Sequence, residues 1–207
     1  HFVRNAAEFG RPHFRAVCGD KIRRAAAAFQ CRSWPFSFGY DIFALEGLVT
    51  IVPYRGYAVA GLTVESFREL CEVRRLLEGE TAALSADRAT DEDIAALESL
   101  TALRYRREDK RTYERYLRAN SAFHQALVRA THNRRLEAMV MAALDQHQWP
   151  LYLGLGVGVD GKASTAEHVD IVEAIRRRKP DKARRVMLDH IIGAEERIAT
   201  ALHGAGY

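Results

Sequence analysis

The sequence predicts a mostly α-helical protein in which a small β-hairpin precedes an antiparallel bundle of about six helices. Apolar residues recur with the 3.6-residue period of an α-helix almost without interruption from Thr63 onward. Two β-prone segments, Leu48–Val52 and Tyr57–Val59, flank a turn that contains Pro53 and Gly56. The helical segments are joined by short connections, which favour antiparallel packing of successive helices in a bundle.

Length and composition are typical of a soluble globular protein. The chain has 207 residues, of which 48% are hydrophobic and 28% are charged. We find no charged-then-apolar leader and no run approaching about 18 apolar residues, so the sequence predicts no membrane-spanning helix. Cys18, Cys31 and Cys71 show no CxxC spacing, which favours reduced thiols and a cytoplasmic location.

Basic residues are concentrated at the beginning of the chain. Residues 1–60 hold eight Lys/Arg and four Asp/Glu, whereas residues 61–207 hold 23 of each. The division falls where the irregular pattern of the first residues gives way to helical periodicity, and it separates a first domain, 1–60, from a second, 61–207. The net charge of +4 therefore belongs to the first domain, which is the part suited to contact a polyanion such as nucleic acid. Charge alone suggests this partner without identifying it.

The first two helices after the hairpin have clear boundaries in the sequence. The first is expected from Val64 to Arg88, with its apolar face at Phe67, Leu70, Leu77 and Leu84. Thr90 is placed to cap the second helix, which begins with the acidic run Asp91–Asp93, where the helix dipole favours negative charge.

Four more helices complete the predicted bundle. They are expected at Arg111–Thr131, Arg134–Trp149, Ser164–Arg178 and Asp181–His203. Pro150 is expected to end the fourth helix, because proline cannot donate the backbone hydrogen bond. The segment Gly154–Gly161 is then expected to be a loop.

Five polar side chains interrupt the apolar faces of these helices: Arg74, Asn120, His124, His168 and His190. A buried polar group without a partner costs roughly 1–3 kcal/mol. One such residue is usually a satisfied core residue, but five at related positions predict a pocket inside the bundle.

The spacing of these residues predicts which of them meet. Asn120 and His124 are four residues apart and share a helix face. His168 and His190 lie eleven residues before and after Lys179, in a predicted helical hairpin that turns at Lys179 and Pro180. Eleven residues is about three helical turns, so both imidazoles should point the same way at the same height.

Three imidazoles and an oxygen donor suit a divalent Zn, Ni, Fe or Mn ion with open coordination positions. A single one of these histidines is more readily explained as a core residue that bonds to a backbone carbonyl. The set of four, Asn120, His124, His168 and His190, favours a metal site. The remaining histidines of the helical region, His132, His147 and His203, are expected to be surface or structural residues.

Arg74 has two interpretations that the sequence leaves open. A buried guanidinium needs an anion. That anion is either a carboxylate of the protein, such as Glu78 or one on another helix, or the carboxylate of a ligand bound beside the metal.

Several segments with specific spacing resemble one known family. They are Leu70–Glu78, Asn120–His124, Ala130–Leu136, His168–Ile175 and Asp181–His190. These segments resemble the FCD effector domain in the FadR branch of GntR-type transcription regulators. The resemblance extends from Leu62 to the end of the chain.

This resemblance implies a homodimer whose helical domain binds a small carboxylate effector. In metal-containing members the ligands are an acidic residue and three histidines, which correspond here to Asn120, His124, His168 and His190. The family commonly has Asp at position 120, and an amide oxygen is a neutral and weaker ligand than a carboxylate. Arg74 corresponds to the arginine that meets the effector's carboxylate.

The resemblance also implies that residues 1–60 form a winged helix-turn-helix that binds DNA. Leu45–Val49 and Pro53–Val59 resemble the end of the recognition helix and the wing. Residues 1–44 are atypical, because aromatic residues and Gly39 replace the helix-forming part of the recognition segment. Divergence and a reading-frame error across this stretch would both account for the difference. The DNA contacts implied by position are Arg32, Ser33, Arg55 and Gly56.

The sequence is therefore interpreted as a ligand-responsive, DNA-binding transcription regulator that binds a pseudo-palindromic operator as a dimer. One alternative is an effector-binding dimer that has lost DNA binding through changes in the recognition segment. A less favoured alternative is a histidine-ligated metalloenzyme. We expect no enzymatic activity, because no acidic residue or histidine lies at a motif-defined distance to act as general base.

Overall fold

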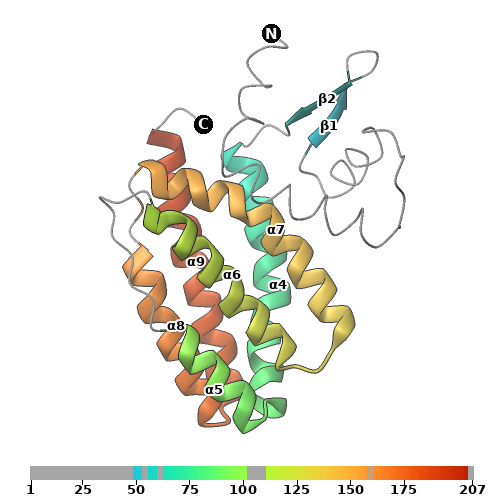
Figure 1. The fold of residues 1–207 in the computed structure, drawn as a ribbon, viewed down its shortest axis with the longest axis vertical. Coiled ribbons are helices and arrows are strands. Elements are labelled where there is room, and N and C mark those ends of the chain that lie inside the picture. Colours follow the sequence, from blue (N-terminus) through green and yellow to red (C-terminus); the bar gives the residue numbers. More distant parts are fainter. Residues whose placement is uncertain are drawn as a thin grey trace. The chain divides into compact units, whose positions relative to one another are not determined.

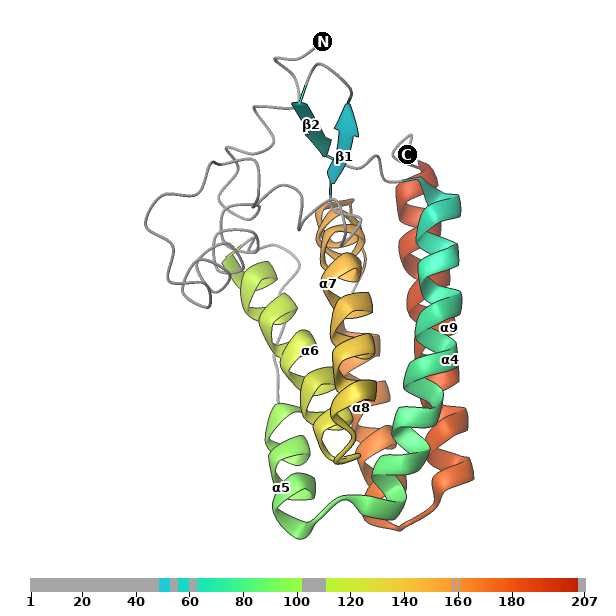
Figure 2. The same cartoon turned by 90° about the vertical axis from the view of Figure 1, so that its right-hand side faces the viewer.

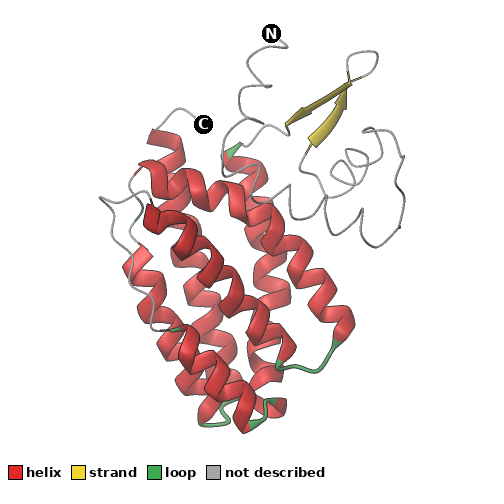
Figure 3. Ribbon diagram, viewed as in Figure 1, coloured by secondary structure: helices red, strands yellow, loops and turns green. Residues whose placement is uncertain are grey.

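The computed structural model describes residues 49–52, 56–59, 63–101, 111–157, 159 and 161–204. The chain divides into two units, His1–Gly61 and Leu62–Tyr207. In the first unit, strands β1 (Val49–Val52) and β2 (Gly56–Val59) pair in antiparallel fashion (Figure 3). The register places Val49 opposite Val59 and Val52 opposite Gly56, which confirms the predicted hairpin.

Most of the predicted DNA contacts lie outside the described residues. Arg32, Ser33 and Arg55 belong to this group, as do the helices of the predicted winged helix-turn-helix. Gly56 is the first residue of β2 and pairs with Val52 at the end of the hairpin next to the turn.

The described part of the second unit is an all-helical bundle (Figure 1). Its six helices are α4 (Val64–Arg88), α5 (Asp91–Leu100), α6 (Arg111–Arg129), α7 (Arg134–Val157), α8 (Gly161–Arg176) and α9 (Pro180–Gly204). Figures 1 and 2 show α4 and α9 side by side along most of their length. Among the described residues, no helix is both long enough and apolar enough to cross a lipid bilayer.

The starts of α4 and α5 are set by reciprocal caps. The backbone N–H of Ser66 donates to the hydroxyl of Thr63, and the N–H of Thr63 donates to the hydroxyl of Ser66. Thr90 and Asp93 make the same exchange at the start of α5. Each cap satisfies backbone donors that have no partner within the helix. The predicted bounds of α4 and the predicted cap at Thr90 are confirmed.

Helix α7 does not end at Pro150, and this prediction is wrong. The helix continues to Val157, so most of the loop expected at Gly154–Gly161 is helical. Pro150 is buried, and the buried leucines Leu151 and Leu155 follow it in the core. Burial of these side chains offsets the lost backbone hydrogen bond, which costs about 3 kcal/mol.

The buried face of α4 also differs from the predicted one. Leu70, Leu77 and Leu84 are only partly buried. Phe67 lies in the core as predicted, and the face that it begins continues through Cys71, Arg74, Glu78 and Ser85. Cys71 is a free thiol, and burial raises its pKa to about 12. The face of α4 that meets the centre of the bundle is therefore rich in polar groups.

Helices α4 and α9 approach closely at Gly79. A Cβ atom at this position would lie 3.1 Å from Cδ2 of Leu188 on α9. Ion pairs of Arg75 with Glu195 and of Glu80 with Arg184 join the same two helices. The absence of a side chain at Gly79 therefore leaves room for the Leu188 side chain where the two helices pack together.

We predict that Gly79→Leu lowers the free energy of unfolding by about 1–3 kcal/mol, because the added side chain must displace the Leu188 side chain of α9. Gly156→Leu is the matched control. Gly156 also lies in a helix, but a Cβ atom there would meet nothing within 4 Å. Urea unfolding followed by circular dichroism measures both variants. Equal losses in the two variants would contradict the close approach at Gly79.

Candidate functional site

Three histidines from three helices converge in the centre of the bundle. His124 lies on α6, His168 on α8 and His190 on α9, and each is at most 4% exposed. The ring centroids are 5.2 Å apart for His124 and His168, 5.4 Å for His124 and His190, and 4.7 Å for His168 and His190. The prediction that His168 and His190 face each other across the α8–α9 hairpin is confirmed.

The three imidazoles have the spacing of a ligand set. One ring nitrogen from each lies within 4.8 Å of the other two. Two nitrogens that share an ion at about 2.1 Å are at most about 4.2 Å apart. The spread of 4.8 Å exceeds this limit, so the rings would have to rotate to place all three nitrogens on one ion.

The environment of His168 and His190 favours the form of imidazole that binds metals. Burial lowers the pKa of His168 well below its ordinary value. Burial also lowers the pKa of His190, to about 4, against the opposing effect of its hydrogen bond to Glu167. Both rings are neutral at pH 7, and neutral imidazole is the ligand form.

Glu78 connects Arg74 to the histidine cluster. Nε of Arg74 donates to Oε1 of Glu78 at 2.6 Å, and Nδ1 of His124 lies 2.5 Å from Oε2 of the same carboxylate. Burial alone would raise the pKa of Glu78, but the Arg74 guanidinium and the His124 ring outweigh burial and hold this pKa well below its usual range. Two anions were considered for Arg74, a carboxylate of the protein and the carboxylate of a ligand. The structure shows the first of these, Glu78. Its contact with His124 was not predicted.

A second carboxylate, Glu167, was missed by the sequence analysis. Its Oε2 lies 2.7 Å from Nδ1 of His190, and its two oxygens accept hydrogen bonds from Arg197 at 3.1 Å. The only sequence signal was its place beside His168. Because neighbouring residues on a helix point in different directions, that signal did not connect Glu167 with His190.

Asn120 lies close to the cluster, as its spacing from His124 predicts. It is 7% exposed and lines a cavity of about 10 Å³ together with His168 and Thr165. A volume of this size is about that needed by one water molecule or a similarly small group. Asn120 is therefore positioned beside His168, and its role as a ligand stays a prediction.

Of the three remaining histidines, His132 and His203 are exposed, as expected. His147 on α7 is buried against Phe67, with ring centroids 5.9 Å apart. Neither of its ring nitrogens has a hydrogen-bond partner among the described residues. Burial holds the pKa of His147 well below its ordinary value, so this ring is also neutral.

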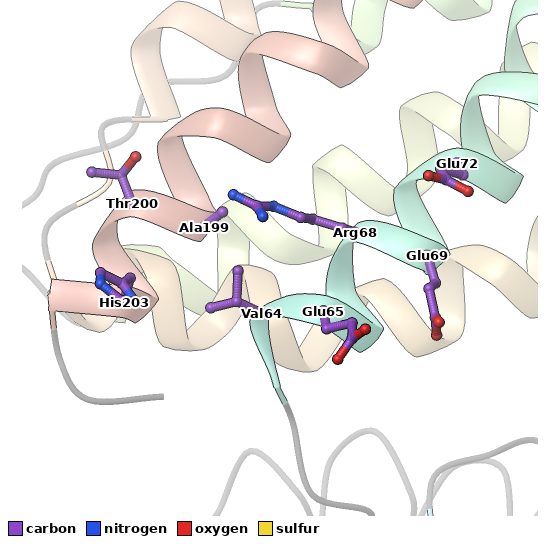
Figure 4. A pocket seen from close by; sticks show the side chains of 8 residues that line it. All are labelled: Val64, Glu65, Arg68, Glu69, Glu72, Ala199, Thr200 and His203. Carbon is purple, nitrogen blue, oxygen red and sulfur yellow. The ribbon is translucent and has the colours of Figure 1, made fainter.

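A larger groove lies between the beginning of α4 and the end of α9 (Figure 4). Its volume is about 840 Å³, and Arg68 extends across it toward Ala199. The groove is also lined by Glu65, Glu69 and Glu72. Three carboxylates beside one arginine disfavour an anionic ligand, so the buried histidine cluster is the better candidate for the functional site.

The buried neutral histidines predict how stability of the metal-free protein depends on pH. His147, His168 and His190 have folded-state pKa values below 6.5. Below pH 6.5 the unfolded chain binds protons that the folded chain does not, so the free energy of unfolding falls as the pH decreases. We predict a loss of about 1 kcal/mol per pH unit for each of these histidines between pH 6 and 5.

The variant His147→Leu isolates one of these groups without changing the three-histidine cluster. We expect it to lose about 1 kcal/mol less than the parent between pH 6 and 5. Urea unfolding at both pH values, in the presence of a chelator, measures the difference. An identical pH dependence in parent and variant would show that His147 is protonated in the folded state.

Comparisons with known proteins agree with this architecture. Residues 69–193, more than half of the chain, match the FCD domain family. The Nta operon transcriptional regulator of Aminobacter aminovorans is 24% identical over 195 residues, which cover 93% of this chain and 90% of that protein. The galactonate operon transcriptional repressor of Escherichia coli is 27% identical over 135 residues, covering 62% and 56% of the two chains.

Solved structures show the same fold. A GntR family transcriptional regulator from Pseudomonas syringae superposes with a TM-score of 0.61 and 21% identity, covering 88% of this chain and 76% of that one. A GntR regulator from Rhodococcus gives a TM-score of 0.64 with 16% identity, covering 95% and 97%. With the match over residues 69–193, the chain belongs to the FCD-domain family of GntR-type transcription regulators.

Proposed function

We propose that this transcription regulator binds a divalent transition metal and a small organic acid in its helical unit, and that the acid changes its affinity for operator DNA. The observation that carries the proposal is the cluster of His124, His168 and His190 in the core. Nε2 of both His124 and His168 is buried without a hydrogen-bond partner among the described residues. Each such atom costs roughly 1–3 kcal/mol unless a bound group satisfies it.

A metal ion satisfies these atoms better than a water molecule would. The three imidazoles each offer a nitrogen within 4.8 Å of the other two, and such ligands suit Zn, Ni, Fe or Mn. His124, His168 and His190 would hold the ion, with the amide oxygen of Asn120 as a further donor. A bound ion supplies positive charge and open coordination positions that a carboxylate can occupy.

Arg74 is proposed to contact the effector's carboxylate. Its Nε is the atom that bonds to Glu78, and this bond fixes the plane of the guanidinium. The Nη groups of a fixed guanidinium form the fork that recognises a carboxylate. A relative is named for the galactonate operon, and galactonate is an organic acid, which agrees with an effector of this chemical class.

The first unit is proposed to bind DNA as part of a homodimer. Residues 1–60 carry the basic excess of the chain, and Arg32, Ser33, Arg55 and Gly56 are the proposed contacts. A two-fold dimer binds two half-sites of a pseudo-palindromic operator. A coupling of about 1–3 kcal/mol between effector and operator would change the operator affinity by about 5- to 150-fold.

The cluster is better suited to binding than to catalysis. A metalloenzyme needs a carboxylate or histidine free to accept a proton from the reacting group. Glu78 already contacts Arg74 and His124, and Glu167 already contacts Arg197 and His190. The two carboxylates next to the histidines are thus committed to contacts within the protein.

We predict about one divalent metal ion per chain in protein purified without chelators, and a loss of that metal in His168→Ala. Elemental analysis by mass spectrometry measures both. In Asn120→Asp the new carboxylate should bind the metal more tightly, because it replaces a neutral donor by a charged one. If the parent and Asn120→Asp both lack stoichiometric metal, the histidines are only polar residues that line a pocket.

We predict salt-dependent binding to genomic DNA fragments that contain the operator. One member of a panel of small organic acids should alter this binding at least fivefold. Mobility shifts at two salt concentrations measure this binding. Arg74→Lys should abolish the response to the acid while leaving DNA binding by the acid-free protein intact. Binding that ignores every acid would contradict the effector site, and no retardation at low salt would favour an effector-binding dimer that has lost DNA binding.

A further inference from the structure

Two of the three clustered histidines are held by carboxylates that are themselves held by arginines. Arg74, Glu78 and His124 form one such chain of contacts. Arg197, Glu167 and His190 form the other. In each chain the carboxylate meets Nδ1 of the histidine, which leaves Nε2 as the nitrogen available to a metal ion.

We propose that Glu78 and Glu167 are positioning residues of the metal site, which aim Nε2 of His124 and His190 at a shared ion and supply the negative charge that Asn120 does not provide. The inference rests on the proposed metal site and adds two residues to it. Glu167, which is hydrogen-bonded to Nδ1 of His190, fixes the tautomer and the orientation of that ring and increases the basicity of its other nitrogen. Glu78 acts on His124 through an ion-pair contact at Nδ1.

The position of Glu78 is fixed at both of its oxygens. Oε1 accepts from Arg74 on the same helix, and Oε2 lies against His124 on α6. Both partners are buried with Glu78 in the core. The carboxylate therefore cannot turn away from His124 without leaving a buried arginine unpaired, which typically costs 3–5 kcal/mol.

Glu167 is fixed by a different set of partners at the edge of the core. Nη1 and Nη2 of Arg197 each donate to one of its oxygens at 3.1 Å, and Nη2 also donates to the hydroxyl of Ser164 at 3.2 Å. Gly193 leaves the space that Arg197 occupies, since a Cβ atom there would lie 2.9 Å from Nη1 of Arg197. The guanidinium thus fixes both oxygens of Glu167, one of which lies against His190.

The charge of these carboxylates matters because the proposed ligands are neutral. Three imidazoles and one amide would leave the full charge of a divalent ion in a buried environment, and burial of an uncompensated charge is costly. Arg74 and Arg197 balance the charges of Glu78 and Glu167, but in each chain the carboxylate is the group in contact with the histidine, so it is negative charge that lies next to His124 and His190. A carboxylate at position 120 would supply negative charge by binding the ion directly.

The competing explanation is that both carboxylates serve only to join helices. Glu80 provides the matched control for that explanation. It also lies on α4 and forms a two-pronged ion pair with Arg184 on α9, with distances of 2.7 and 2.9 Å. Unlike Glu78, it is exposed, and it pairs with an arginine rather than a histidine.

The experiment compares Glu78→Gln, Glu167→Gln and Glu80→Gln with the parent. Glutamine keeps the size of the side chain but removes its charge. Metal-free protein is titrated with Co²⁺, whose absorption spectrum reports ligand geometry, and Zn²⁺ affinity is measured by competition with a chelator. We expect 10- to 100-fold weaker binding in Glu78→Gln and Glu167→Gln, with an altered Co²⁺ spectrum. Glu80→Gln should match the parent in both measurements.

Glu167→Gln still tests the positioning role if Glu78→Gln fails to fold. The Glu167 side chain is 28% exposed, and glutamine can still accept a hydrogen bond from Arg197, so we expect a folded protein by circular dichroism. Adding Asn120→Asp to Glu167→Gln should restore part of the lost affinity, because it returns a negative charge to the site. No recovery would overturn the charge part of the inference.

Two further outcomes separate this inference from the proposed metal site. If the parent binds Zn²⁺ and Glu167→Gln binds it equally, with an unchanged Co²⁺ spectrum, the positioning role is overturned and the metal site stands. If the parent binds neither ion, both the metal site and the positioning role are overturned.

Discussion

The buried contact between Arg74 and Glu78 is the interaction on which the centre of the bundle depends. A guanidinium cannot lose its proton in a protein, so Arg74 needs an anion wherever it is buried. Glu78 satisfies it one helical turn away and then contacts His124 on α6 with its other oxygen. Removal of one partner from a buried ion pair typically costs 3–5 kcal/mol. The pair therefore keeps a polar face of α4 at the core and aligns it with the histidines of the other helices.

The packing around this pair explains why the centre remains polar. Gly79 allows α9 to lie against α4, and α9 contributes His190 to the cluster. The turn between α8 and α9 places His168 opposite His190, and Phe123 stacks on the His168 ring at a centroid distance of 3.9 Å. Apolar side chains thus surround a small set of polar groups. This arrangement strengthens electrostatic interactions within the site, because the surroundings are less polarisable than water.

Capping residues and helical periodicity predicted the helices well where residues close together in the sequence determine the structure. Thr90 caps α5 through an exchange of hydrogen bonds with Asp93, three residues away, and the start of this helix was predicted from its sequence. The start of α4 at Val64 was predicted from the periodicity of its apolar residues, and its cap at Thr63 was not predicted. The symmetry of His168 and His190 about Lys179 likewise needed only helix geometry. Predictions failed where contacts between helices determine the structure. Pro150 remains inside α7 because buried leucines follow it, and Glu167 meets a histidine on the adjacent helix that no spacing within α8 could indicate.

The three clustered histidines come from α6, α8 and α9, and this distribution has a consequence for the lifetime of the protein. An ion bound by all three would join α6 to the α8–α9 hairpin, and it would bind only the folded state. By mass action, free metal at 100 times its dissociation constant would add about 2.7 kcal/mol to the free energy of unfolding. The supply of metal would then set how much regulator escapes proteolysis, so the abundance of the protein would follow the metal status of the cell.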